Sequence, residues 1–183
     1  MTALKNNNSK NASKILIFDT NIFLTGIDLN IIKDLIYTTP SVIDEIRISK
    51  KNRNIISKIQ TSITTKKLIL KIPKKKFLNI IEQKSMETGD FNALSKVDRE
   101  LLALALELIE SSELKVEVYT NDYSMENVCS KLNIPFSPLY KKGIKSAIIW
   151  EIYCPFCKNV YMADELNKFC EVCGSKLKRR PKN

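Results

Sequence analysis

Residues 14–21 read KILIFDTN, and they give the clearest indication of the fold. Its first five residues are almost continuously apolar, which is typical of a strand buried on both faces, as strands of parallel sheets are. A carboxylate, Asp19, follows at once. Functional sites of open α/β sheets form beyond the carboxyl ends of the strands. The segment therefore predicts a parallel sheet with a candidate site at its edge.

Strands and helices alternate through the next 120 or so residues. Further strands are expected at residues 68–70, 116–119 and 134–139. Helices are expected at residues 30–36, 40–46, 51–63, 74–86, 95–109 and 124–132. The helix that opens at Ser95 has the clearest pattern, because its apolar residues recur at spacings of three and four. This order predicts an α/β domain in which helices flank a parallel sheet.

Two Cys-x-x-Cys pairs near the end of the chain indicate a metal site. They are separated by twelve residues and consist of Cys154, Cys157, Cys170 and Cys173. Each pair forms a turn that aims two sulfurs at one point, so the pattern predicts one structural zinc ion in a small zinc ribbon. Two disulfides in a secreted domain are the alternative, and the polar start of the chain, which has no apolar signal segment, disfavours them. Cys129 lies apart and is expected to be a small buried hydrophobe.

The composition divides the chain into five segments. We expect a disordered leader (1–13), an α/β domain (14–140), a linker (141–151), the ribbon (152–178) and a basic tail (179–183). The ribbon is too small for a core of its own and must draw its folding free energy from the metal. No run of eighteen apolar residues exists, so nothing is expected to span a membrane and we expect a cytoplasmic protein.

Positive charge is concentrated in two places along a chain with a net charge of +10. Residues 46–81 hold eleven Lys and Arg and no acidic residue, and another unopposed basic cluster follows Cys173. A solvated lysine-rich face is the plainer interpretation, and a surface for a polyanion is the sharper one. We favour nucleic acid. The candidate RNA-binding residues are Arg47, Lys50, Lys51, Arg53, Lys74, Lys75, Lys76, Lys178, Arg179 and Arg180.

The chain has no histidine, which excludes hydrolases of the Ser-His-Asp and Cys-His types and nucleases with a histidine base. It has four glycines and no Gly-x-x-x-x-Gly-Lys loop for a nucleotide phosphate. Any catalysis must therefore use carboxylates and a metal ion.

Four carboxylates are expected near the carboxyl edge of the sheet. Asp19 and Asp122 follow strands, whereas Glu45 and Asp98 lie near the starts of helices. Such charges would repel one another unless a hard cation lay between them, which predicts a Mg²⁺ or Mn²⁺ site. Each carboxylate also has a simpler explanation. Asp19 and Asp122 could cap helices, Asp98 could complete a capping box with Ser95, and Glu45 could be a surface residue.

Four sequence motifs resemble those of PIN-domain ribonucleases. They are DTN at 19–21, PSVIDEI at 40–46, LSKVD at 94–98 and TND at 120–122. The resemblance covers roughly residues 14–140. The later segments DYSMENV at 122–128 and GIKSAIIW at 143–150, together with the ribbon, are similar to the endonucleases that mature the 3′ end of small-subunit ribosomal RNA. Many relatives have a second acid where this chain has Asn121.

The resemblance implies a metal-dependent endoribonuclease that leaves a 5′ phosphate and a 3′ hydroxyl. Its catalytic residues would be Asp19, Glu45, Asp98 and Asp122, which would bind one or two Mg²⁺ or Mn²⁺ ions. The residues that would orient these carboxylates without binding the metal are Asn21, Ser95 and Asn121. The implied substrate is a ribosomal RNA precursor, and the implied partners are the assembling small ribosomal subunit and a KH-domain assembly factor.

Two other functions remain open from the sequence. A toxin-type PIN ribonuclease would share the acids, although such proteins are usually shorter and lack a ribbon. A non-catalytic RNA-binding scaffold would use the same charge and ribbon, but it would have little reason to keep four mutually repelling carboxylates.

Overall fold

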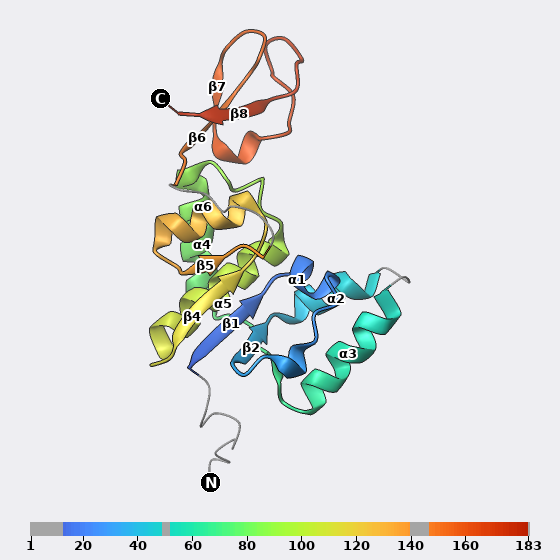
Figure 1. Cartoon of the computed structure of the whole chain (residues 1–183). Coiled ribbons are helices and arrows are strands. Elements are labelled where there is room, and N and C mark those ends of the chain that lie inside the picture. The colour runs from blue at the N-terminus through green and yellow to red at the C-terminus, as the bar shows by residue number, and fades with distance from the viewer. Residues whose placement is uncertain (1–12, 49–51, 140–146, 183) are drawn as a thin grey trace.

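A computed structural model describes residues 13–48, 52–139 and 147–182 (Figure 1). Several expectations concern residues outside these ranges: the leader before residue 13, Lys50 and Lys51, and most of the linker. Within them, no helix is both long enough and apolar enough to cross a membrane.

A five-stranded parallel sheet forms the centre of the larger lobe. Its strands, in the order β3-β2-β1-β4-β5, are β3 (Leu68–Leu70), β2 (Leu35–Thr38), β1 (Lys14–Phe18), β4 (Lys115–Tyr119) and β5 (Phe136–Ser137). β1 is the central strand, and every one of its residues after Lys14 is therefore buried. Its last residue, Phe18, lies in register with Tyr119 of β4. The chain therefore leaves β1 and β4 at the same level, next to each other.

Helices pack around the sheet. In the described part of the chain they are α1 (Thr20–Leu24), α2 (Pro40–Ile48), α3 (Arg53–Thr64), α4 (Lys75–Thr88), α5 (Lys96–Ser111) and α6 (Tyr123–Leu132). One continuous apolar core joins strands and helices, and α5 contributes Leu101 to Ala105 to it without an exposed position. The predicted α/β class is confirmed, with helices on a parallel sheet.

The expected helix over residues 30–36 is wrong. A short 3-10 helix, Leu29–Ile31, is followed by strand β2. The apolar residues of this segment are compatible with either period, because a short apolar run does not distinguish a helix from a buried strand. Pairing with the central strand β1 decides the outcome, and Ile36 is completely buried there.

The C-terminal lobe is a small antiparallel sheet. Its strands, in the order β7-β6-β8, are β7 (Val160–Tyr161), β6 (Trp150–Tyr153) and β8 (Lys178–Pro181). This sheet takes in Trp150, which the sequence places in the linker, and Arg179 and Arg180, which the sequence places in a tail. The added residues lie in β6 and β8, which pair with each other.

The ribbon lobe contacts the larger lobe beside α4 and α6 (Figure 1). Gly89 ends α4 with a φ of 76°, a conformation that favours glycine. A Cβ at Gly89 would also overlap the backbone of Trp150 at the start of β6. The two lobes therefore approach each other too closely at this point for any side chain.

Candidate active site and metal-binding ribbon

Asp19 is the buried carboxylate at the centre of the sheet edge. It directly follows β1, is 4% exposed, and accepts a hydrogen bond of 2.8 Å from the hydroxyl of Thr120. Burial is the main reason that its pKa rises to about 6; the bond from Thr120 opposes the rise and the charge of Asp98 adds to it. A carboxylate in this state is stabilised by a cation.

Thr120 links the loops that carry Asp19 and Asp122. Its hydroxyl donates to Asp19 and accepts the backbone N–H of Asp122 at 3.1 Å. Thr120 is completely buried just beyond β4. The motif TND at 120–122 contains this threonine, but the motif alone does not indicate its role. A hydroxyl-bearing residue two positions before a candidate carboxylate was the available signal.

Asp122 caps α6 and also faces the site. Its carboxylate accepts the backbone N–H groups of Ser124 at 2.6 Å and Met125 at 3.3 Å. The simpler explanation, a helix cap, is therefore confirmed. The capping bonds use one carboxylate oxygen, Oδ1, so they do not exclude a metal at the other.

Asp98 and Ser95 form the capping box that the sequence indicated. The Ser95 N–H donates to Asp98 at 2.7 Å, and the Asp98 N–H donates to the Ser95 hydroxyl at 3.1 Å. Burial raises the pKa of Asp98, the bonds from Ser95 lower it, and the charges of Asp122 and Glu45 raise it again. Asp98 therefore experiences the electrostatic field of both of these carboxylates.

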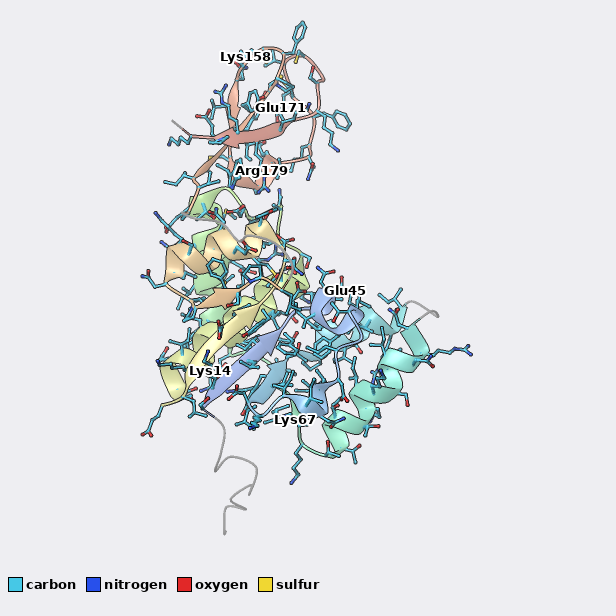
Figure 2. All side chains as sticks on the ribbon, in the orientation of Figure 1. Lys14, Glu45, Lys67, Lys158, Glu171 and Arg179 are labelled. Atoms are coloured by element: carbon cyan, nitrogen blue, oxygen red, sulfur yellow. The ribbon has the colours of Figure 1, made fainter. Side chains whose placement is uncertain are left out.

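Glu45 lies on the exposed side of α2 and reaches toward α1, where it accepts a hydrogen bond of 2.5 Å from Thr20 (Figure 2). Ser41 of the same helix donates to Glu100 of α5, which fixes α2 against the helix that carries Asp98.

The four carboxylates thus surround one edge without touching. Among the described residues, no three of them have ligand oxygens within 4.8 Å of one another. Their charges nevertheless act on one another: the charge of Asp98 raises the pKa of Asp19, and the charges of Asp122 and Glu45 raise the pKa of Asp98. An all-oxygen donor set of this kind fits hard divalent cations such as Mg²⁺ or Mn²⁺.

The proposed supporting amides have different surroundings. Asn21 is exposed on α1. The side-chain oxygen of Asn121 accepts the backbone N–H of Leu139 at 3.1 Å, so it holds the segment after β5. A role for either residue at a metal stays a prediction.

The four ribbon cysteines lie together and could hold one metal ion. All their sulfurs are within 4.8 Å of one another, with Cys154 and Cys173 at 3.4 Å and Cys157 and Cys170 at 3.5 Å. A tetrahedral zinc site with Zn–S bonds of about 2.3 Å needs sulfurs about 3.8 Å apart, so the donor set fits zinc. Cys129 is a buried free thiol, as expected.

The two Cys-x-x-Cys turns have the same backbone hydrogen bonds. Cys154 N–H donates to Asn159 and Cys170 N–H donates to Ser175, at 2.9 and 2.8 Å. The Tyr161 hydroxyl lies 2.9 Å from the Cys170 sulfur. This hydroxyl can donate a hydrogen bond to the Cys170 thiolate when the thiolate binds a metal, and metal ligands usually have such a hydrogen-bond partner.

The basic segment from residue 46 to residue 81 is not unopposed in space. Helix α5 supplies Glu107, which pairs with Lys71 at 3.1 Å and Lys74 at 3.8 Å, and Glu110, which pairs with Lys76 at 2.8 Å. The pKa of Glu107 is lowered overall. Burial raises it, but the hydrogen bonds and charges of Lys74 and Lys71 lower it by more. Part of this positive charge therefore stabilises the packing of the segment against α5.

The C-terminal arginines are also paired, which corrects the expectation of an unopposed cluster. Arg179 contacts Asp90 of the larger lobe at 2.8 Å, and Arg180 contacts Glu151 at 2.7 Å. Asp90 is completely buried. Sequence reasoning missed Asp90, because nothing local marks a carboxylate whose partner is 89 residues away.

The parallel sheet and its carboxylate edge define a class of protein. The family described as PIN domain of ribonuclease matches residues 16–108. The molecule is accordingly a PIN-domain nuclease, a metal-dependent endoribonuclease.

Relatives narrow the class. Endoribonuclease Nob1 of Pyrococcus abyssi is 33% identical over 91% of this chain and 94% of that protein. Endoribonuclease Nob1 of Methanocaldococcus jannaschii is 32% identical over 91% of this chain and 78% of that protein. Ribonuclease VapC1 of Thermoplasma acidophilum is 32% identical over 90% of this chain and 77% of that protein. The chain belongs to the Nob1 family of endoribonucleases.

Proposed function

We propose that this nuclease cleaves a ribosomal RNA precursor at the 3′ end of the small-subunit rRNA during ribosome biogenesis. The observation that carries the proposal is the group of four carboxylates, Asp19, Glu45, Asp98 and Asp122, at a sheet edge in a chain that also has a ribbon docked beside it. The similarity to Nob1 endoribonucleases extends over both lobes and supports the same function.

Divalent ions, Mg²⁺ or Mn²⁺, would supply Lewis-acid stabilisation of charge on the scissile phosphate. The chain's own residues set the geometry. Thr120 orients Asp19, Thr20 orients Glu45, and Ser95 orients Asp98. These bonds keep carboxylate oxygens in fixed directions, which a metal site needs for activity.

A basic cleft between the two lobes suits the path of the RNA. The cleft has a volume of about 520 Å³ and lies between the loop after α4 and the ribbon. Asn92 and Ala93 line one side, close in sequence to Ser95 and Asp98, and Lys176 and Lys178 line the other. The two lysines would neutralise phosphates of a strand that leads to the carboxylates.

The ribbon also exposes apolar side chains that suit unpaired bases. Phe156 is 77% exposed and Phe169 is 69% exposed. Bases of any sequence stack on such rings. We assign one zinc to the four cysteines and place the nuclease on the assembling small subunit, with a KH-domain assembly factor as a candidate partner.

The proposal is tested by substrate choice. A precursor that spans the small-subunit 3′ end should be cut once, at the mature end, whereas the same single-stranded region without its flanking duplexes should be cut slowly and at several places. Equal cutting of both RNAs at scattered positions would favour a general or toxin-type ribonuclease instead. Binding without any cut would favour a scaffold.

A further inference from the structure

Arg179 is a ribbon residue whose side chain reaches the larger lobe (Figure 2). Its guanidinium donates to the Asp90 carboxylate at 2.8 Å and to the Ser124 hydroxyl at 3.2 Å. It also lies 4.5 Å from the centre of the Trp150 ring. These contacts fix the direction of the planar guanidinium group, because its donors form a rigid fork.

The contact with Ser124 leads directly to the candidate active site. Ser124 is 5% exposed at the start of α6, and its backbone N–H donates to Asp122 at 2.6 Å. One residue therefore separates the ribbon's arginine from a candidate metal-binding carboxylate. A shift of Ser124 moves the donor that orients Asp122.

A second connection holds the same part of α6. The side-chain amide of Asn127 donates to Asp90 at 2.6 Å and to the backbone oxygen of Ile148, also at 2.6 Å. Asp90 thus binds both Arg179 and α6 at a buried position. Buried polar groups that satisfy one another in this way rigidify their surroundings.

We propose that Arg179 is a positioning residue for the nuclease reaction, which acts through Ser124 on Asp122 and so makes the carboxylate edge depend on the folded ribbon. The inference rests on the nuclease activity of the family and not on the identity of the RNA. It assigns the ribbon a role at the metal site in addition to any contact with substrate.

Ser124→Ala is the most selective test, because it removes the hydroxyl that Arg179 contacts and keeps the N–H that caps Asp122. Ser130→Ala is the matched control, since it makes the same change at the other end of α6. Two quantities are measured on the full, zinc-loaded chain. They are the maximal rate on an unstructured RNA oligonucleotide and the affinity for Mn²⁺ by calorimetry without RNA.

We expect Ser124→Ala to lower the maximal rate or the Mn²⁺ affinity by about 10- to 100-fold, which is the usual effect of removing a residue that orients a metal ligand. The RNA affinity should be unchanged. Ser130→Ala should match the wild type. Arg179→Met should have at least the effect of Ser124→Ala, because it also removes the ion pair of the buried Asp90. The double variant should be no worse than Arg179→Met alone, because the contact with Ser124 is already lost in that variant. Lys168→Met, which removes another ribbon charge, controls for charge alone.

Unchanged Mn²⁺ affinity and maximal rate in Ser124→Ala would overturn the inference. So would effects of the two substitutions that multiply in the double variant. A fall in RNA affinity alone on Arg179→Met would place this arginine in substrate binding. Because the oligonucleotide is not ribosomal, these outcomes do not depend on whether a ribosomal RNA precursor is the substrate.

Discussion

Asp19 is buried where folding alone would disfavour a carboxylate. Its burial penalises the ionised form, and the hydrogen bond from Thr120 offsets only part of this, since the pKa stays raised, at about 6. The metal-free protein therefore carries a local cost that a bound cation would remove. Such a cost is common at functional sites, where activity is kept at the expense of stability.

Asp19→Asn should stabilise the metal-free protein at neutral pH. An unfolded Asp has a pKa of about 3.9, whereas the folded state raises it to about 6. The folded state thus favours the protonated form, and the wild type loses stability as pH rises through this window. The variant's free energy of unfolding should exceed that of the wild type by almost nothing at pH 4 and by at most about 3 kcal/mol above pH 7. Urea unfolding of both proteins at the two pH values measures it.

The same substitution should abolish cleavage and leave RNA affinity equal or higher, because it removes a charge that would bind metal and repel phosphate. Mn²⁺ should stabilise the wild type more than the variant. A variant that cuts normally in Mg²⁺ or Mn²⁺ would exclude Asp19 from the mechanism.

At the scale of elements, the ribbon contains four clustered cysteines that could hold a metal ion, and it also contains a natural reporter of its folding. Trp150, the only tryptophan in the chain, begins β6 and lies against Arg179 at the junction of the lobes. We expect one zinc per chain by elemental analysis. Removing it should unfold the ribbon and shift the Trp150 fluorescence toward that of an exposed indole. An unchanged spectrum after complete removal of zinc would contradict a structural metal site.

Some of the lysines at the start of α4 form ion pairs within the fold, and we expect the same lysines to bind RNA as well. Lys74 and Lys76 pair with Glu107 and Glu110 of α5, although all but Glu107 remain largely exposed. Replacing Lys74, Lys75 and Lys76 with Ala should flatten the slope of log RNA affinity against log salt. The change should be about 0.7 to 0.9 for each phosphate that the variant no longer neutralises. An unchanged slope would show that these lysines serve α5 alone.

Local patterns in the sequence predicted most elements but not the contacts between distant ones. The apolar run before Asp19, the helix from Ser95 and its capping box were all predictable, because each depends on near neighbours. Strand β2 was missed because its pairing with β1 decides its structure. The ion pair of Asp90 with Arg179 and the paired lysines were missed because charge counts along a chain do not show which charges meet in space.

At the scale of the whole molecule, the two lobes are held by close packing as well as by Arg179. Gly89 and Gly26 have φ angles of 76° and 75°, but only at Gly89 would a Cβ meet another residue, Trp150. Gly26→Ala should cost about 1 kcal/mol through backbone strain.

Gly89→Ala should lower the free energy of unfolding clearly more than Gly26→Ala does, because the ribbon must also move away from the added methyl group. The difference should appear in urea unfolding and in the Trp150 fluorescence. Equal costs for the two substitutions would show that the lobes are not tightly packed at this point.

The molecule is a metal-dependent nuclease, and we propose that it matures small-subunit rRNA. The most direct measurement incubates the zinc-loaded chain with a precursor of the small-subunit 3′ end and Mn²⁺, and then maps the cut and its end groups. We predict a single cut at the mature 3′ end that leaves a 3′ hydroxyl and a 5′ phosphate, and no cut with Asp19→Asn. A cyclic phosphate end, cleavage that persists in Asp19→Asn, or cuts scattered along the precursor would contradict the proposed function.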